Sequence, residues 1–178
     1  PVVGLSGGSR FGHRGFAGGE QHAGNASGRA LAGPYQYTVS NTMRKVLVLS
    51  TAAVEDSLLE KVAAADWEVY SAQEATPARA LLTEHSFEVG LAILFSCESE
   101  RAIQWLVDLI LARRKMQWVM VLSRQCVERK LLSTVIAEHC YDYHTLPIEP
   151  QRLVVTLGHA YGMATLTENT LRQQRELE

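Results

Sequence analysis

Short apolar runs alternate with helix-patterned segments along most of this chain, and this alternation constrains its fold more than any other feature. The centres of three runs, residues 45–49, 89–95 and 118–122, carry almost only apolar side chains. A strand with one solvated face would instead alternate polar and apolar residues. Strands that are apolar throughout are buried on both faces, as in a parallel sheet covered by helices. The sequence therefore predicts an α/β protein.

Ten segments follow one another in strict alternation, beginning with a strand. The expected strands are 45–49, 67–72, 88–95, 117–123 and 141–145, and the expected helices are 54–65, 75–85, 99–115, 126–140 and 149–163. Thr76 and Ser99 are the expected N-caps of the second and third helices. Because β–α–β units join parallel strands through right-handed crossovers, we expect a three-layer, flavodoxin-like (βα)5 fold with strand order 2-1-3-4-5.

Composition divides the chain at Met43. Ten of the 13 glycines precede this residue, in a segment without an apolar period of 2 or 3.6 residues. Such a segment is typical of disorder, so we interpret residues 1–42 as a disordered or non-native extension, vector-derived or mis-started. Residues 43–163 form the expected domain. The polar tail, 164–178, either continues the last helix as a linker that pairs between protomers or frays.

Charge and cysteine content narrow the class of protein. The net charge of −2 gives no indication of nucleic-acid or membrane-surface binding. The three cysteines, Cys97, Cys126 and Cys140, are odd in number and widely spaced, which is typical of reduced thiols in the cytosol. No apolar run approaches about 18 residues, so no membrane span is expected. We therefore expect a cytoplasmic protein.

The size and alternation of the chain resemble the receiver domain of a bacterial response regulator. This resemblance implies a phosphorylation site at the carboxyl ends of the strands. In receivers, two acidic residues after strand 1 and an aspartate ending strand 3 hold Mg²⁺, and that aspartate accepts the phosphoryl group. A hydroxyl after strand 4 and a lysine after strand 5 bind the phosphoryl oxygens.

The first and third expected strands lack the acidic groups of a receiver. Ser50 and Thr51 occupy the positions of the acidic pair, and the acceptor position falls at Ile93, within one or two residues. No carboxylate lies between Glu88 and Glu98. Without anionic ligands, the pocket could not hold Mg²⁺ against water. We therefore expect no metal cofactor and no phosphorylation by the usual aspartate route.

The fourth and fifth expected strands retain a hydroxyl but lose the cation. Ser123 fits the hydroxyl position, Tyr143 fits the switch aromatic of receivers, and Leu146 replaces the lysine before the proline. Serine after a strand is also common turn chemistry, so Ser123 alone is weak evidence. The expected pocket is vestigial.

Residues 138–163, "EHCYDYHTLPIEPQRLVVTLGHAYGM", carry a more specific resemblance. They are similar to the end of the N-terminal receiver-like domain of sigma-54-dependent transcription activators of the vibrio polysaccharide regulator type. The shared features are an aromatic-rich last strand, a residue other than lysine before the proline, and a final GH-x-x-GM. The similarity covers roughly residues 43–170. It implies an ATPase domain and a DNA-binding domain elsewhere in the full protein, and no "GxxxxGK[ST]" motif occurs in this chain.

The resemblance favours a non-catalytic regulatory domain. In this interpretation a pseudo-receiver forms a homodimer and controls its own ATPase domain, and it meets DNA only through the other domains. The face built from the fourth helix, fifth strand and fifth helix usually makes such contacts in receivers. Arg129, His144 and Arg152 are the interface candidates on that face, beside Tyr143.

Two alternatives remain open. Some members of the family respond to cyclic di-GMP, and the basic clusters 113–115 and 124–130 contain guanidinium groups that could hold its phosphates and purines. A flavodoxin-like redox protein is the other alternative. It is disfavoured because the loop after the first strand, "STAAVED", lacks the glycine of a phosphate-binding loop.

Overall fold

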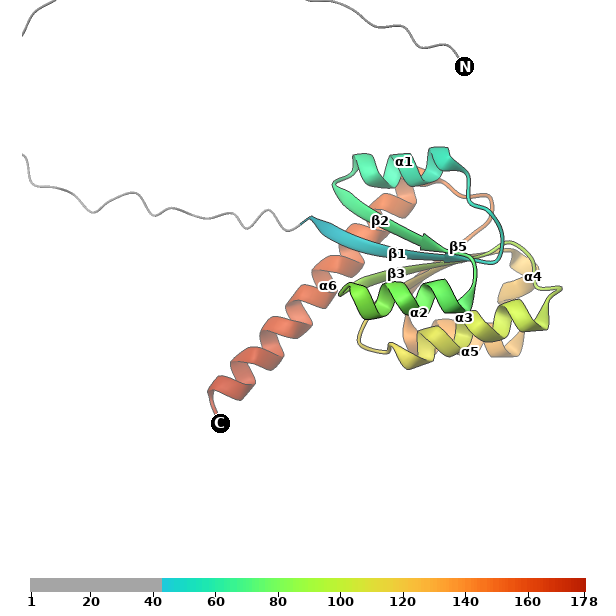
Figure 1. Cartoon of the computed structure of the whole chain (residues 1–178). Coiled ribbons are helices and arrows are strands. Elements are labelled where there is room, and N and C mark those ends of the chain that lie inside the picture. Colours follow the sequence, from blue (N-terminus) through green and yellow to red (C-terminus); the bar gives the residue numbers. More distant parts are fainter. Residues whose placement is uncertain (1–42) are drawn as a thin grey trace, which may run out of the picture. The chain divides into compact units, whose positions relative to one another are not determined.

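The computed structural model describes residues 43–178 as a five-stranded sheet with six helices (Figure 1). The interpretation of residues 1–42 as an extension lies outside the described residues. In chain order the elements are β1 (Arg44–Ser50), α1 (Asp56–Ala64), β2 (Trp67–Ala72), α2 (Ala75–Glu84), β3 (Val89–Leu94), α3 (Glu100–Ala112), β4 (Gln117–Leu122), α4 (Arg124–Val127), α5 (Lys130–His139), β5 (Cys140–Thr145) and α6 (Pro150–Glu176).

The sheet has the expected topology. Its order is β2-β1-β3-β4-β5, and every neighbouring pair of strands is parallel. The prediction of a flavodoxin-like fold with order 2-1-3-4-5 is confirmed. In such a sheet the carboxyl ends of β1 and β3 lie side by side, which is where this class of fold places its sites.

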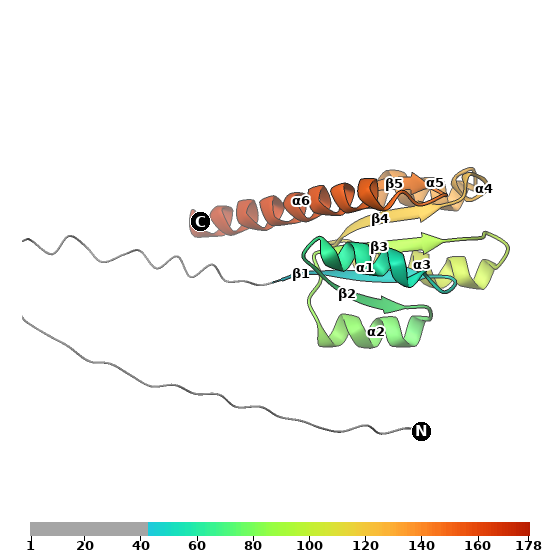
Figure 2. The ribbon, with the colours of Figure 1, turned by 90° about the horizontal axis from the view of Figure 1, so that it is seen from above.

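Helices cover both faces of the sheet (Figure 2). On one face, apolar residues of α1 and α6 pack on the inward side chains of the central strands, such as Val48 and Ile93. On the other face, α2, α3 and α5 pack on side chains such as Leu49 and Met120. This division follows the period-two alternation of side chains along each strand.

Gly90 in β3 leaves room for a tryptophan on the face of the sheet that α2, α3 and α5 cover. A Cβ atom at this position would lie 2.3 Å from Cζ3 of the buried Trp118 on β4. The indole of Trp118 therefore occupies the space of the missing side chain, and its Nε1 donates a hydrogen bond to the Arg113 carbonyl at 3.0 Å. The glycine and the tryptophan form one packing unit at the centre of the sheet.

The expected helix at 126–140 is wrong in its limits and its continuity. The structure has a short α4, then a break at Glu128 and Arg129, then α5. α4 begins early because the Ser123 side chain accepts a hydrogen bond from the Cys126 amide at 3.3 Å. Arg129 has an extended backbone, with φ −70° and ψ 128°, which ends the helical run. The domain consequently has six helices where five were expected.

The two predicted N-caps have different outcomes. Ser99 caps α3, and its hydroxyl accepts a hydrogen bond from the Ala102 amide at 3.2 Å. Thr76 does not cap α2, because that helix already begins at Ala75 and is preceded by an extended Glu74 that makes no side-chain cap. The prediction for Thr76 was wrong by about half a turn.

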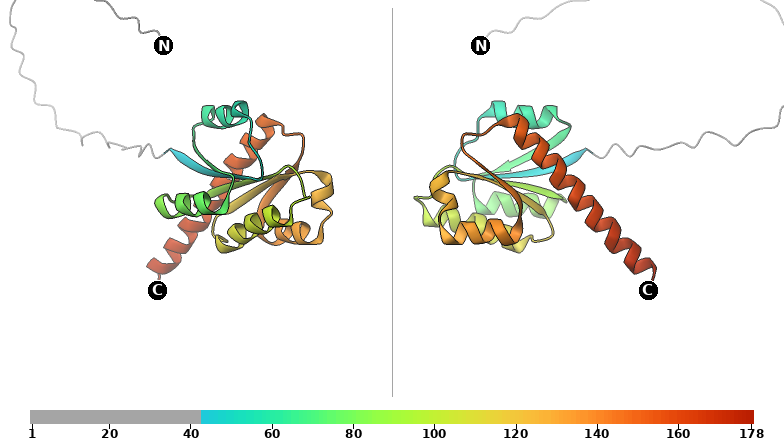
Figure 3. Two further views of the ribbon diagram at one scale, coloured as in Figure 1. Left: turned by 45° about the vertical axis from the view of Figure 1, so that its right-hand side comes forward. Right: turned by 180° about the vertical axis from the view of Figure 1, so that it is seen from behind.

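The last helix is continuous from Pro150 to Glu176 (Figure 3). Its first turns pack on the sheet through Leu153, Leu157 and Ala160. Residues 165–176 are exposed and run past the amino edge of the sheet. The tail is therefore helical to Glu176, whereas its role as a linker that pairs between protomers stays a prediction. None of the helices described in residues 43–178 is long and apolar enough to cross a membrane.

Candidate functional site

The carboxyl end of β1 carries two hydroxyls where a receiver has acids. Ser50 is 2% exposed, and its hydroxyl donates to the Ala52 carbonyl at 2.7 Å. The Thr51 amide donates to the Ile93 carbonyl at 3.2 Å, and the Thr51 hydroxyl accepts from the Phe95 amide at 3.4 Å. Both hydroxyls are thus engaged by nearby backbone. They hold the β1 and β3 loops together and carry no charge for a metal ion.

The acceptor position on β3 is buried in the core. Ile93 is fully buried within the apolar cluster between the sheet and helices α1 and α6. Phe95, Leu146 and Ile148, from the loops after β3 and β5, pack against the same cluster. Apolar side chains therefore line this edge where a receiver has its aspartates and lysine.

Ser123 and Leu146 lie at the ends of β4 and β5. The Ser123 hydroxyl caps α4 and also contacts the Cys126 sulfur at 3.1 Å. The Leu146 amide donates to the Leu122 carbonyl at 3.0 Å, which closes the end of β5 against β4. All five proposed pocket positions therefore lie at or just beyond the carboxyl ends of β1, β3, β4 and β5, at one edge of the sheet. Their vestigial role stays a prediction.

Carboxylates do not gather at this edge. Within residues 43–178 no three histidine, cysteine, aspartate or glutamate side chains lie close enough together to hold a metal ion. Glu100, which follows the β3 loop, forms an ion pair with Arg129. The described residues offer Mg²⁺ no anionic ligand set.

The edge strand β5 is the exposed strand of the sheet. Tyr143 is 42% exposed, and Tyr141 and Asp142 beside it are also exposed. β5 pairs only with β4, so its other edge has backbone groups without strand partners. Tyr143, the predicted switch aromatic, lies on this open strand.

His144 and Arg152 are brought together across β5 and α6. The His144 Nε2 atom lies 2.7 Å from the Thr156 hydroxyl, which itself donates to the Arg152 carbonyl at 3.1 Å. The Arg152 side chain is exposed and pairs with Glu149 at 3.5 Å. His144 therefore ties the edge strand to the last helix, while Arg152 points to solvent. The role of both residues at an interface stays a prediction.

Arg129, the third interface candidate, is engaged elsewhere. It forms an ion pair with Glu100, which raises the pKa of its guanidinium, and its Nη1 atom donates to the Cys97 carbonyl at 2.8 Å. Its side chain thus lies against the loop between β3 and α3. The structure does not bring Arg129 together with His144 and Arg152.

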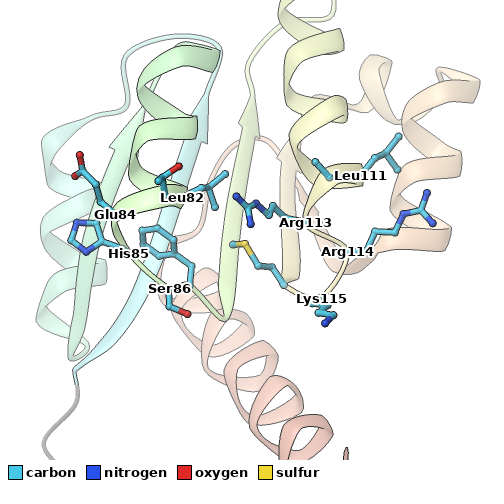
Figure 4. A pocket seen from close by; sticks show the side chains of 12 residues that line it. Leu82, Glu84, His85, Ser86, Leu111, Arg113, Arg114 and Lys115 are labelled. Carbon is cyan, nitrogen blue, oxygen red and sulfur yellow. The ribbon is translucent and has the colours of Figure 1, made fainter.

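The two basic clusters lie at opposite edges of the sheet. Residues 113–115 follow α3 and precede β4, whereas residues 124–130 follow β4. The first cluster lines a cavity of about 760 Å³ between the ends of α2 and α3, beside His85 and Phe87. In Figure 4 the Arg113 side chain reaches toward the end of α2, whereas Arg114 and Lys115 point away from it. The length of β4 separates the clusters, so they form no composite site.

An aromatic–arginine cluster at the amino edge was not expected from the sequence. The Arg44 guanidinium carbon lies 4.5 Å from the centre of the Trp67 ring and 5.8 Å from that of Tyr161. Arg44 also donates to the Ala65 carbonyl at 2.6 Å, and the two aromatic rings meet edge to face. Burial raises the pKa of Tyr161, with a further contribution from Glu88. This cluster fixes the middle of α6 against β1 and β2.

A protein-family model described as VpsR domain matches residues 35–158, which is more than half of the chain. No curated protein sequence matches.

Solved structures share the fold at low sequence identity. NtrX from Brucella abortus in complex with ATP is similar with a TM-score of 0.61 and 16% identity, over 72% of this chain and 29% of that chain. A CheY-like response regulator receiver domain protein from Methanospirillum hungatei gives 0.57 and 17%, over 71% and 99%. An adenylate cyclase from Rhodopirellula baltica gives 0.59 and 14%, over 74% and 97%. This chain therefore spans under a third of NtrX and has the receiver fold.

Proposed function

The chain belongs to the VpsR domain family, a receiver-like regulatory domain of sigma-54-dependent activators, and on this premise we propose that it is a non-catalytic pseudo-receiver. It regulates an attached ATPase domain through dimerisation and interdomain contacts. It is not phosphorylated by the usual aspartate route.

One observation carries the proposal: the carboxyl edge has no carboxylate where the chemistry requires one. Mg²⁺ needs a set of oxygen ligands, usually including carboxylates, and phosphoryl transfer needs a nucleophilic carboxylate. Ser50, Thr51 and Ile93 supply neither charge nor such a nucleophile. Leu146, packed against the same core, supplies no cation for a phosphoryl group. Under this proposal, signal input acts through surface contacts.

Exposed large side chains on the edge strand β5 (Tyr143) and on the outer side of α6 (Val155, Met163 and Leu166) support self-association. All four side chains are large, apolar or aromatic, and exposed, with Leu166 at 64%. The three α6 residues are spaced by eight and three positions, so they lie on one side of the helix. We call these four residues the β5–α6 surface.

A second copy of this chain is the proposed occupant of the β5–α6 surface. A two-fold interface buries the same surface on both subunits, and the open edge of β5 offers unpaired backbone groups to a second copy. α6 is 27 residues long, and its exposed part, residues 165–176, extends along one helix beyond the sheet. Because this helix is continuous, it would also connect the dimer to an ATPase domain in the full protein, so that a change in the dimer could move that domain.

Light scattering across a concentration series tests the dimer. We expect a dimer for the unaltered protein and a shift toward monomer for Leu166→Glu, which places a charge in the proposed interface. Leu171→Glu is the matched control, because Leu171 lies on the opposite side of α6, against the cavity at the amino edge. A strictly monomeric protein at high concentration would contradict the proposal.

A second candidate function is binding of cyclic di-GMP, and the cavity beside residues 113–115 favours it. Residues 113–115, His85 and Phe87 line this cavity, and of the three cations Arg113 reaches toward the end of α2. Guanidinium groups both pair with phosphates and stack on purines. Calorimetry with cyclic di-GMP tests this candidate. Measurable heat that Arg113→Ala abolishes would support it, whereas no heat at high micromolar ligand would exclude binding by this domain alone.

A further inference from the structure

A second cavity at the amino edge of the sheet lies between the exposed part of α6 and the loops that precede β3 and β4. Residues 86–88 and 114–117 line it together with six residues of α6. Its volume is about 640 Å³, which is in the size range of sites for small molecules. We call it the α6 cavity. It is separate from the vestigial pocket, which lies at the carboxyl edge.

A single side of α6 faces this cavity. The α6 residues that line it follow the spacing i, i+3, i+4, i+7, i+8 and i+11, which places them on one side of a helix. They are Ala164, Thr167, Glu168, Leu171, Arg172 and Arg175. The exposed apolar residues Val155, Met163 and Leu166 lie on a different side of the same helix. The α6 cavity therefore does not depend on the proposed dimer.

Two pairs of cations line the α6 cavity from separate segments of the chain. Arg172 and Arg175 belong to α6, whereas Arg114 and Lys115 belong to the loop between α3 and β4. In Figure 4 the Arg114 and Lys115 side chains point away from the end of α2. All four side chains are exposed, and none takes part in an ion pair within residues 43–178.

Carboxylates offset only part of this positive charge. Glu88 and Glu168 are the acidic residues that line the cavity, which leaves an excess of two positive charges. The dipole of α3 favours the cations that follow its last turn, Arg114 and Lys115. It does not account for Arg172, which precedes the last turn of another helix, α6, and lines the same cavity. Cations from two elements around one space indicate a site for an anion.

The loop between α3 and β4 has a fixed backbone. The Arg113 carbonyl accepts hydrogen bonds from the Met116 amide at 3.1 Å and from the Trp118 Nε1 atom at 3.0 Å. The Gln117 amide donates to the Glu88 carbonyl at 2.9 Å, which ties this loop to the one before β3. An anion would therefore meet cations on a loop that is already ordered, and this lowers the entropic cost of binding.

We propose that the α6 cavity binds a small anion with two or more linked phosphates, such as inorganic triphosphate or a nucleoside triphosphate. Guanidinium groups pair with phosphate oxygens in a bidentate manner, and an ammonium group binds them as a point charge. The buried side chains Phe87 and Met116 also line the cavity, and such apolar walls strengthen the field of the cations.

One polyphosphate can contact the cations of α6 and those of the loop together. Binding would then fasten the exposed part of α6 to the domain. This site also differs from the candidate site for cyclic di-GMP, because Arg113 lines only the first cavity and Arg172 only the α6 cavity.

Calorimetry with inorganic triphosphate tests the site, in magnesium-free buffer at about 0.15 M salt, where charges more than about 8 Å apart are largely screened. Arg172→Ala should weaken binding about tenfold, because it removes a charged contact with phosphate. Arg152→Ala is the matched control, since it removes an exposed arginine at the other end of α6, where Arg152 pairs with Glu149. Its affinity should stay within about twofold of the unaltered protein.

Hydrogen–deuterium exchange provides a second measurement. Triphosphate should slow amide exchange in residues 165–176, and Arg172→Ala should remove this protection. A parallel titration with ATP distinguishes the two sources of the phosphates. Equal affinity would mean that the phosphates alone are recognised, whereas tighter binding of ATP would mean that the nucleoside also contacts the cavity.

Three results would overturn the proposal. The first is no heat at millimolar triphosphate. The second is equal weakening by Arg172→Ala and Arg152→Ala, which would show attraction to net charge without a site. The third is binding without slower exchange in residues 165–176, which would place the anion elsewhere.

Discussion

β3 and β5 belong to the same parallel sheet, yet they differ in burial and in composition. Every residue of β3 is buried, and its sequence, VGLAIL, is wholly apolar. No residue of β5 is fully buried, and its sequence, CYDYHT, is polar and aromatic. Position explains the contrast, because β3 has strands on both sides and β5 is an edge.

The contrast matters because both strands carry functional groups in a receiver. β3 would supply the phosphate acceptor, and β5 would supply the switch aromatic and precede the lysine. Here β3 contributes packing alone, whereas β5 keeps an exposed aromatic, Tyr143, beside an open edge. Under our proposal, β5 keeps its role in binding a partner, although β3 has lost the phosphate-accepting aspartate.

The largest expected effect is that of Ile93→Asp, which restores a carboxylate on β3. Ile93 is fully buried among apolar side chains, so its replacement leaves a polar or charged group without a partner. We expect a loss of about 4 kcal/mol or more in the free energy of unfolding, measured by urea denaturation.

Ile93→Val is the matched control, with an expected loss of about 1 kcal/mol. If Ile93→Asp were as stable as Ile93→Val, this position would have to be solvated, and the contrast between β3 and β5 would fail.

Gly90→Ala tests the packing of β3 from the other face. The added Cβ would lie 2.3 Å from Trp118, whose fully buried ring cannot move without disturbing the core. We expect a loss of about 2 kcal/mol in unfolding free energy.

Gly162→Ala should change the free energy of unfolding in the opposite direction. Nothing lies within 4 Å of a Cβ at Gly162, which is in α6, so alanine should stabilise the helix by up to about 1 kcal/mol. Equal effects of the two substitutions in thermal or urea denaturation would contradict the packing of Trp118 against Gly90.

Cys140 gives β5 a stability that depends on pH. Burial raises the pKa of its thiol from 9.0 to about 12, so above pH 9 the unfolded state releases this proton while the folded state retains it. The free energy of unfolding should therefore fall between pH 9 and about 12, by about 1.4 kcal/mol per pH unit from this group.

Urea denaturation at pH 8, 9 and 10 measures this decline, and Cys140→Ala should show a shallower one. If the unaltered protein and Cys140→Ala showed the same pH dependence, the Cys140 thiol would have to be as exposed to solvent as the outward side chains of β5.

Tyr143→Ala should have the smallest effect on folding. The side chain is exposed on the edge strand, so we expect less than about 0.5 kcal/mol in unfolding free energy. Because the ring belongs to the proposed interface, the dimer dissociation constant should rise about tenfold, as sedimentation equilibrium would measure. Tyr143→Phe keeps the ring and should remain close to the unaltered protein. A large folding defect in Tyr143→Ala would place this ring in the core.

The architecture could be predicted because it depends on local patterns. Continuous apolar runs identified the buried strands, and strict alternation with helices led to the parallel order. The break between α4 and α5 could not be predicted, because it has no glycine or proline. It occurs at Arg129, whose side chain binds the Cys97 carbonyl 32 residues away in the sequence.

The position of the site could be predicted in part, because it depends on the order of the strands. Ser50, Thr51 and Ser123 follow strands, so their gathering at one edge follows from topology. The contacts of Arg129 with Glu100 and the Cys97 carbonyl could not be predicted, because they join segments distant in the sequence; its role at an interface stays a prediction. The stacking of Arg44 on Trp67 and Tyr161 joins segments too distant for any local pattern to reveal.

Treatment with acetyl phosphate and Mg²⁺, followed by intact-mass spectrometry, tests the central claim most directly. The pseudo-receiver interpretation predicts an unchanged mass, because the carboxyl edge offers neither metal ligands nor an acceptor carboxylate. A stoichiometric gain of about 80 Da that base removes would show an acyl phosphate on this domain and would contradict that interpretation.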